Sequence, residues 1–304
     1  MKLGRPALVA GALAVGAAAV AVAARRSARK QSPDGKFLSV DGVELHYLER
    51  GEGTPVVLLH GNGVTAEDWV VSGVFDGLAT NHRVLAFDRP GFGYSNRPKR
   101  VVWTPARQAE LVRGALAQLG VERAVVVGQS WGTLVAVALA LDFPDLVERL
   151  VLVSGYYFPS VRLDVAAAST LTAPVIGGVL RSTVAPLAGR LLAPVVYREI
   201  FAPAPVPERF ARFPLALSLR PSQMRAQAED ATLMDRAAAA MQARYRELAM
   251  PVVIIAGRGD RLVPTAEQSA RLADAVPHAI ARYIDECGHM AHYCSPELVI
   301  AAAT

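Results

Sequence analysis

The residues best suited to do chemistry lie in Gly128-Gln129-Ser130-Trp131-Gly132, where glycines flank the serine at a distance of two residues. An apolar run precedes this segment at 124–127, and an alanine-rich helical pattern follows it at 134–141. A buried strand that passes at once into a helix needs a tight turn, which the glycines permit and which holds the serine strained at its apex. There the N–H of Trp131 can meet developing negative charge. The segment predicts a nucleophilic Ser130; the alternative is an ordinary turn with a solvated serine.

A serine hydroxyl is a weak nucleophile at neutral pH, so it needs a base within hydrogen-bond distance and an acid that orients the base. His289 and Asp260 are the candidates. Asp260 follows an apolar strand pattern at 251–256, on the rim where parallel strands end and such sheets bind ligands. His289 follows the last strand pattern, at 280–284, and the glycine before it frees the loop to bring the imidazole over the serine.

The chain order Ser130, Asp260, His289, each just after a predicted strand, resembles that of the α/β-hydrolase family. The resemblance covers about residues 37–303. It implies a Ser-His-Asp triad. It also implies an α/β fold, the α/β-hydrolase fold, with a mostly parallel eight-stranded sheet, helices on both faces and an inserted helical cap.

The resemblance also implies the second half of an oxyanion hole in the loop His60-Gly61-Asn62-Gly63, which follows the apolar run at 55–59. In the family this position supplies a backbone N–H, so the N–H of Asn62 is expected to pair with that of Trp131. His60 is expected to shape the loop by hydrogen bonding rather than to act as a base. The alternative is a glycine-rich turn with an incidental histidine.

Other charged or metal-binding residue types have structural interpretations. The two acids just before the candidate base, Asp285 and Glu286, suit a solvated loop better than an anchor for the ring. The pair Asp88-Arg89 predicts an ion pair that stabilises its own turn. His292 lies three residues beyond the candidate base, but no acid or cysteine pattern completes a metal site around it. We therefore expect neither a metal nor a cofactor.

The fold is predicted from apolar strand patterns at 37–40, 43–49, 55–59, 83–87, 124–127, 150–153, 251–256 and 280–284. Asp41-Gly42 predicts a hairpin between the first two strands. Helical spacing occurs at 104–119 and 134–141, and a final helix is expected from about residue 295. Residues 31–155 and 251–304 are expected to form the core.

Between the two parts of the core, residues 156–250 show recurrent prolines and helical pieces without a buried-strand run, which predicts a helical cap. This segment carries eleven arginines and seven acidic residues. Its apolar residues are expected to form mainly the cap's own core and in part a substrate pocket. They are Leu171, Val175, Ile176, Leu180, Leu191, Leu192, Phe201, Phe210, Phe213 and Leu217.

The N-terminal segment 1–30 contains an uncharged, apolar run at 7–24. As a helix this run would span about 27 Å, close to the thickness of a hydrocarbon core. Basic residues flank it on both sides, and more of them follow it. We interpret it as a membrane anchor with the catalytic domain in the cytoplasm. The alternatives are a signal peptide cleaved after Ala21-Val22-Ala23, with export of the protein, and a peripheral or buried helix.

Composition excludes some classes of partner. The net charge of +5 comes with no basic run interleaved with aromatics, so no nucleic-acid site is expected. The two cysteines, Cys287 and Cys294, flank the candidate base and are too few for a disulfide framework. We expect two free thiols; a single bridge in an oxidising compartment is the alternative.

Taken together, the motifs predict a serine hydrolase that cleaves a small or medium-sized, apolar ester through an acyl-enzyme. Carbon–carbon bond hydrolysis and cofactor-free haloperoxidase or perhydrolase chemistry use the same triad in the family and stay open. The residue after the nucleophile, Trp131, also occurs in family dehalogenases, but their nucleophile is an aspartate where this chain has Ser130. Dehalogenation and epoxide opening are therefore not expected. The rival from another class is a non-catalytic small-molecule receptor on the same fold.

Overall fold

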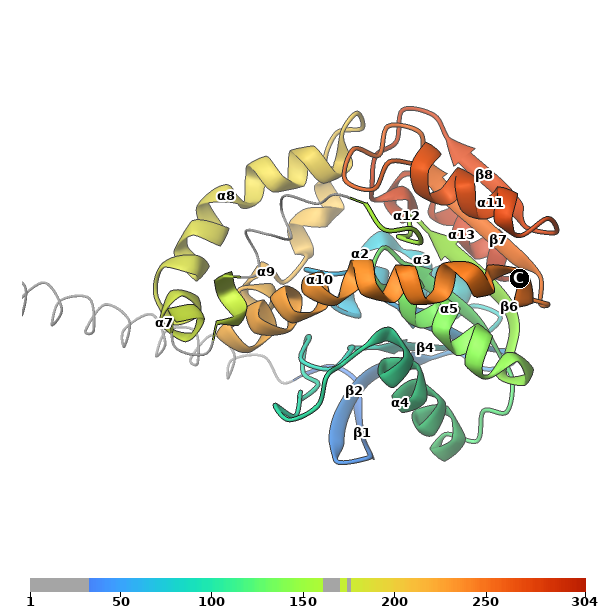
Figure 1. The fold of residues 1–304 in the computed structure, drawn as a ribbon, viewed down its shortest axis with the longest axis horizontal. Helices are drawn as coiled ribbons and strands as arrows, with labels where there is room; N and C mark the ends of the chain where they lie inside the picture. The colour runs from blue at the N-terminus through green and yellow to red at the C-terminus, as the bar shows by residue number, and fades with distance from the viewer. Residues whose placement is uncertain (1–32, 161–169, 174–175) are drawn as a thin grey trace, which may run out of the picture.

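The computed structural model describes residues 33–160, 170–173 and 176–304 (Figure 1). Within these residues eight strands form one sheet in the order β1-β2-β4-β3-β5-β6-β7-β8. The pairs β1–β2 and β2–β4 are antiparallel, and all the others are parallel. The strands are β1 Lys36–Val40, β2 Val43–Arg50, β3 Pro55–Leu59, β4 Arg83–Phe87, β5 Ala124–Gln129, β6 Val147–Val153, β7 Val252–Gly257 and β8 Ile280–Ile284. The predicted fold class is confirmed.

The central strands are continuous apolar runs because helices bury both of their faces. Every residue of β5 and of β7 is buried. Parallel strands covered on both sides lose the alternation of polar and apolar residues, and this makes them easy to recognise in a sequence. The strands at the two edges, β1 and β8, are largely exposed or half-buried. The carboxyl ends of β3, β4, β5 and β7 thus meet at one rim.

Two groups of helices cover the sheet (Figure 1). One face packs against α4 Pro105–Gln118, α5 Gly132–Asp142 and α11 Arg271–Ala275. The other face packs against α2 Glu67–Ser72, α3 Val74–Leu78 and α13 Pro296–Ala303. The start of α4 follows from its sequence, because Thr104 accepts the N–H of Arg107 and Pro105 occupies the first turn. Helix α5 is apolar all round and is buried all round.

The segment between β6 and β7 is helical, and it carries α7 Ile176–Ser182, α8 Val184–Phe201, α9 Leu215–Ser218 and α10 Pro221–Met241. In Figure 1, α7 and α8 form the outer edge of this segment, and α10 runs from it along the core. The second half of α10 places Met234, Ala238 and Met241 in the same buried cluster as α5. Helix α10 therefore joins the cap to the core.

The prediction that most apolar cap residues form the cap's own core is only partly right. Four of them are buried: Phe201, Phe210, Phe213 and Leu217. Three others are exposed, with exposed fractions of 67% for Ile176, 81% for Leu191 and 56% for Leu192. For these three the prediction is wrong, because α7 and α8 have no second layer of described residues outside them. Val175 lies outside the described residues.

A buried ion-pair cluster fastens α10 to the core. Asp230 of α10 accepts hydrogen bonds from Nη1 of Arg89 at 2.5 Å and from Nη2 of Arg97 at 2.9 Å. The side chains of Asp230 and Arg89 are almost completely buried. Burial lowers the pKa of Arg89 below its ordinary value, and the charge of Asp230 opposes that shift. The cap thus depends on a carboxylate that is shared by two arginines of the loop after β4.

This cluster overturns one prediction, the ion pair between the neighbours Asp88 and Arg89. Asp88 instead pairs with Nδ1 of His46 on β2, at 2.7 Å, and accepts the N–H groups of Ala66 and Tyr94. Successive side chains at the end of a strand point to opposite faces, so the two charges separate. The Asp88 side chain secures the loop, while Arg89 faces the cap.

Among the described residues, no single helix is both long and apolar enough to cross a bilayer. The pair α7 and α8, which meet at an angle of 56°, passes the same criteria of length and composition when taken together. The apolar run at 7–24 lies outside the described residues, so its proposed role as an anchor stays a prediction.

The shared carboxylate gives a test of cap attachment. We expect Asp230→Asn to lower the free energy of unfolding by about 3 kcal/mol, because it leaves a buried guanidinium without its counter-charge. Glu229→Gln removes a partly exposed carboxylate that pairs with Arg97, and it should cost less than about 1 kcal/mol. Urea denaturation of both variants measures the difference. If both variants lost the same free energy of unfolding, the buried ion pairs of Asp230 would contribute no more to stability than the partly exposed pair of Glu229.

Candidate active site

Ser130 occupies the sharp turn between β5 and α5. Its φ of 50° lies in the left-handed region, which a non-glycine residue rarely adopts. The helix can start this close to the sheet only because Gly132 has no side chain: a Cβ there would lie 2.2 Å from the carbonyl oxygen of Leu59. Strained backbone of this kind persists where surrounding structure fixes it, often at functional sites. The turn directs the Ser130 hydroxyl out of the sheet and into a cavity.

The structure brings the three predicted triad residues together. Nε2 of His289 lies 2.9 Å from Oγ of Ser130, and Nδ1 of His289 lies 2.8 Å from Oδ2 of Asp260. The other carboxylate oxygen, Oδ1 of Asp260, accepts the N–H groups of Leu262 and Val263 at 3.0 and 2.8 Å. The carboxylate is therefore held by its own loop, and its Oδ2 accepts a hydrogen bond from the protonated Nδ1 of the ring. The lone pair of Nε2 then faces the hydroxyl, which is the arrangement that proton transfer requires.

The two predicted oxyanion donors border the same cavity as Ser130 and His289. Neither the N–H of Asn62 nor that of Trp131 has a hydrogen-bond acceptor among the described residues. Backbone N–H groups without a partner are rare inside proteins, so two of them beside the candidate nucleophile are free to bind an oxygen atom. The side chain of Asn62 donates to the carbonyl of Gln227 on α10 at 3.1 Å, which ties this loop to the cap.

His60 is buried behind the Asn62 loop and makes two hydrogen bonds. Its Nε2 accepts the N–H of Arg89 at 3.0 Å, so Nδ1 carries the proton and donates it to the carbonyl of Gly61 at 2.7 Å. Burial lowers the pKa of His60 to about 3, and the nearby charge of Arg89 acts in the same direction. A ring that is neutral and bonded on both sides supports the loop; it is not within reach of the reacting atoms in the way that His289 is.

Arg89 is a residue near the site whose position the sequence did not indicate. Its guanidinium donates to the carbonyl oxygens of His60 and Gly61 at 2.9 and 3.0 Å. It also lies between the rings of Phe92 and Trp131, at 4.3 and 4.4 Å from their centroids. Arg89 thus contacts both segments that carry the free N–H groups. One feature of the sequence could have indicated a role for Arg89. It comes just after β4, so it lies at the rim of the sheet where the other site residues lie.

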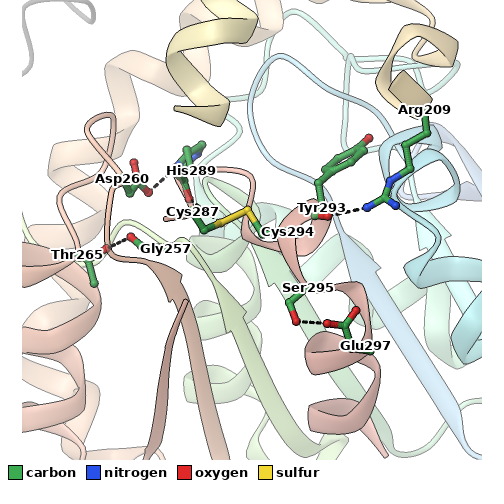
Figure 2. Close-up of a disulfide and its surroundings, with 11 residues drawn as sticks. Arg209, Gly257, Asp260, Thr265, Cys287, His289, Tyr293, Cys294, Ser295 and Glu297 are labelled. Carbon is green, nitrogen blue, oxygen red and sulfur yellow. Dashed lines mark hydrogen bonds and ion pairs between the residues drawn. A yellow bond between two sulfur atoms is a disulfide. The ribbon is translucent and has the colours of Figure 1, made fainter. Parts of the chain in front are cut away.

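A disulfide braces the loop that carries the candidate base (Figure 2). The prediction of two free thiols is wrong, because Cys287 and Cys294 are bonded to each other. The short helix α12 Ala291–Cys294 turns the chain back on itself, so the two Cα atoms lie only 6.2 Å apart, within the usual range for a bridge. The loop is further held where the N–H of Gly259 donates to the carbonyl of Cys287 at 2.9 Å.

The same loop is pressed against the end of α8. The N–H of His289 donates to the carbonyl of Ile200 at 2.9 Å. A Cβ on Gly288 would lie 2.2 Å from the carbonyl oxygen of Ala202. Because this glycine has no side chain, the loop of the candidate base, His289, can approach the cap this closely.

The rival acid Asp285 and the second histidine have partners elsewhere, and the other rival acid, Glu286, is exposed. Asp285 is exposed and pairs with Arg258 at 2.8 Å. His292 is buried, and its Nε2 lies 2.8 Å from Oδ2 of Asp68, whose other oxygen accepts the hydroxyl of Tyr293. Asp260, rather than Asp285, is thus the carboxylate that holds the ring of the candidate base.

The cavity above Ser130 has a volume of about 440 Å³ and lies between core and cap. Its walls come from α8, α10 and the loops around them. They include Tyr156, Tyr197, Phe210, Phe213, Met224 and Met234. No Lys, Arg, Asp or Glu occurs among the described residues that line it. The site therefore suits an uncharged, largely apolar compound of small to medium size.

The close approach at Gly288 can be tested directly. We expect Gly288→Ala to lower kcat about 100-fold, because the added methyl group displaces the base from Ser130 and small displacements of catalytic groups are that costly. Gly178→Ala on α7 is the matched control, since a Cβ there meets nothing within 4 Å. Steady-state kinetics of both variants, with circular dichroism to check folding, supplies the comparison. A Gly288→Ala enzyme with full kcat would contradict the tight fit.

The low pKa of His60 predicts an acid-sensitive contribution to stability. The folded pKa of about 3 lies below the unfolded value of about 6.5, so the unfolded state binds more protons between these pH values. The free energy of unfolding should fall as the pH drops through this window, by about 5 kcal/mol in total from this group. Urea denaturation from pH 7 to pH 4 should show a smaller slope for His60→Gln. An unchanged slope in His60→Gln would contradict the prediction.

Comparisons with known proteins agree with this geometry. A family model described as "alpha/beta hydrolase fold" matches residues 54–296. The chain is 30% identical over 267 residues to the 2-hydroxymuconate semialdehyde hydrolase of Pseudomonas putida, covering 86% of this chain and 90% of that protein.

Solved structures show the same relationship. A meta-cleavage product hydrolase of Pseudomonas fluorescens superposes with a TM-score of 0.66 at 25% identity, covering 88% of this chain and 97% of the other. An esterase of a Rhodococcus species gives a TM-score of 0.67 at 26% identity, covering 87% and 94%. The sheet, the turn at Ser130 and these matches lead to one conclusion: the chain belongs to the α/β hydrolase fold family.

Proposed function

We propose that this protein is a serine-dependent hydrolase that breaks a bond to the carbonyl carbon of an uncharged, largely apolar compound. The observation that carries the proposal is the continuous hydrogen-bonded chain from Asp260 through His289 to Ser130, which ends in a cavity whose described lining residues include no Lys, Arg, Asp or Glu. A receptor on the same fold would have no need of an aligned base, a held carboxylate and two free amide donors around one hydroxyl.

The geometry supports the following steps. His289 removes the proton of Ser130 as its Oγ attacks the carbonyl carbon, and Asp260 stabilises the imidazolium. The carbonyl oxygen becomes an oxyanion between the N–H groups of Asn62 and Trp131, each worth about 3 kcal/mol in the transition state. His289 then gives its proton to the leaving group, and an acyl-enzyme remains. Water, activated by the same ring, attacks the acyl carbon and releases Ser130.

The first candidate for the broken bond is a carbon–carbon bond next to a ketone. The curated relatives that are 29–30% identical to this chain are named as hydrolases of 2-hydroxymuconate semialdehyde and of 2-hydroxy-6-oxononadienedioate. A carbanion leaves readily only when its electron pair is delocalised into a conjugated carbonyl. The substrate would therefore be a conjugated diketone, and the proton from His289 would end on carbon. These relatives favour this alternative over the ester that the sequence motifs alone suggest.

An apolar ester is the second candidate, and the cavity is what favours it. The substrates in the names of these relatives are carboxylates, whereas the described residues that line this cavity include no Lys or Arg side chain to pair with one. An esterase is also among the structures similar to this chain. Any carbon–carbon substrate of this protein is therefore expected to be uncharged at the end that lies in the cavity.

A substrate panel with one active-site variant tests the proposal. It should contain an uncharged conjugated 1,5-diketone, its carboxylate analogue and p-nitrophenyl esters of increasing acyl length. We expect turnover of the uncharged diketone above that of the carboxylate, and a loss of about 10⁶-fold in kcat for Ser130→Ala. Ser39→Ala, at an exposed position on β1, should keep the wild-type rate.

Each outcome of the panel is decisive. Higher kcat/KM for the esters would favour the second candidate, and preference for the carboxylate would contradict the uncharged pocket. Fluorophosphonate labelling of Ser130 is an independent check on the nucleophile. Folded protein that binds panel members but neither turns them over nor becomes labelled would be a receptor, and the hydrolase proposal would fail.

A further inference from the structure

Helix α8 is apolar on two opposite sides. Its inner side lines the cavity through Gly189, Ala193, Val196, Tyr197 and Ile200. These positions follow the spacing i, i+4, i+7, i+8, i+11, which places them on one side of a helix. The inner side of α8 therefore forms one wall of the cavity.

The outer side of α8 carries exposed apolar residues at the helical spacing i, i+4, i+8. Leu187, Leu191 and Val195 have exposed fractions of 54%, 81% and 64%. Arg190 and Arg198 complete the stripe and are exposed as well. Helix α7 extends the apolar surface, because Ile176 and Val179 are 67% and 59% exposed.

This surface, made by the exposed apolar residues of α7 and α8 and called here the outer cap face, is unusual for a protein surrounded by water. Contiguous exposed apolar residues mark a binding surface, and a helix that is apolar all round normally lies in a core or in lipid. Helices α7 and α8, which carry the outer cap face, lie on the side of the cap that faces away from the sheet (Figure 1). Together, α7 and α8 even match a membrane span in length and composition.

The charges on this face indicate the kind of partner. Arg190 and Arg198 lie within the exposed stripe, and the only acidic residue of α7 and α8 is Glu199. Apolar side chains mixed with arginines are typical of helices that lie in the plane of a bilayer, where arginines pair with anionic headgroups.

We propose that the outer cap face docks on an anionic lipid bilayer, with α7 and α8 lying in the boundary between headgroups and acyl chains. The pair does not cross the bilayer, because its inner side forms the wall of the cavity and the end of α8 is hydrogen-bonded to the loop of His289. The N-terminal sequence supports a membrane as the partner: residues 7–24 are apolar and basic residues flank them. Two weak attachments of this kind together hold a protein at a membrane far better than either alone.

A fluorescent reporter can test the contact independently of any other attachment. The native tryptophans, Trp69, Trp103 and Trp131, are at most 2% exposed, so they are shielded from lipid. Leu191→Trp in the full chain places an indole on the outer cap face. Val102→Trp is the matched control, because Val102 is 68% exposed and lies on the core rather than on the cap.

We expect vesicles of phosphatidylcholine and phosphatidylglycerol to shift the emission of Leu191→Trp to shorter wavelengths, and brominated lipids to quench it. Bromine near the headgroups should quench more than bromine at the chain ends. Vesicles of phosphatidylcholine alone should give a smaller shift, and Val102→Trp should show neither effect. No shift in Leu191→Trp on vesicles to which the protein is bound would overturn the proposal.

Other occupants of the outer cap face give different results, and each would also overturn it. A second copy of the chain would shift the emission without vesicles and in proportion to protein concentration. Cover by another part of the same chain would shift it without vesicles at any concentration. Stronger quenching from the chain ends would mean that α7 and α8 cross the bilayer. None of these readouts uses turnover, so a failure here leaves the proposed hydrolase activity untouched.

Discussion

A single buried guanidinium connects the parts of this molecule that must work together. Arg89 pairs with Asp230 on the cap, donates to two carbonyls of the Asn62 loop and stacks on Trp131. Such a group is costly to bury unless all of its hydrogen-bond donors are used, so the surrounding segments are held in one arrangement. The positions of the cap and of the two free amide donors are therefore set by the same interaction.

The sequence indicated the core and the three aligned side chains because their signals are local. Strands buried on both faces appear as unbroken apolar runs, and β3, β4 and β8 begin and end at the predicted residues. Gly128 and Gly132 indicated the tight turn at Ser130. Asp260 and His289 each follow a strand, and parallel strands bring their ends to one rim, so their meeting with Ser130 follows from topology.

What the sequence did not indicate depends on contacts between distant segments. The partner of Arg89 lies 141 residues away on a helix whose packing has no local signature. The bridge between Cys287 and Cys294 depends on the single turn of α12, which is too short to show periodicity. In the cap, apolar residues at helical spacing predict burial on one side, yet α8 is apolar on both. Spacing alone cannot distinguish a core residue such as Phe210 from an exposed one such as Leu191.

The hydrogen bond from the N–H of His289 to the carbonyl of Ile200 links the end of α8 directly to the ring that contacts Ser130, so the two are expected to move together. A cap that swung outward from this end would pull the imidazole off the serine. His289 and Ser130 would thus be out of hydrogen-bond contact whenever this end of the cavity was open to water. Motions that admit a substrate without that penalty must hinge near Ile200 and act at the far end of the helix, beside α7.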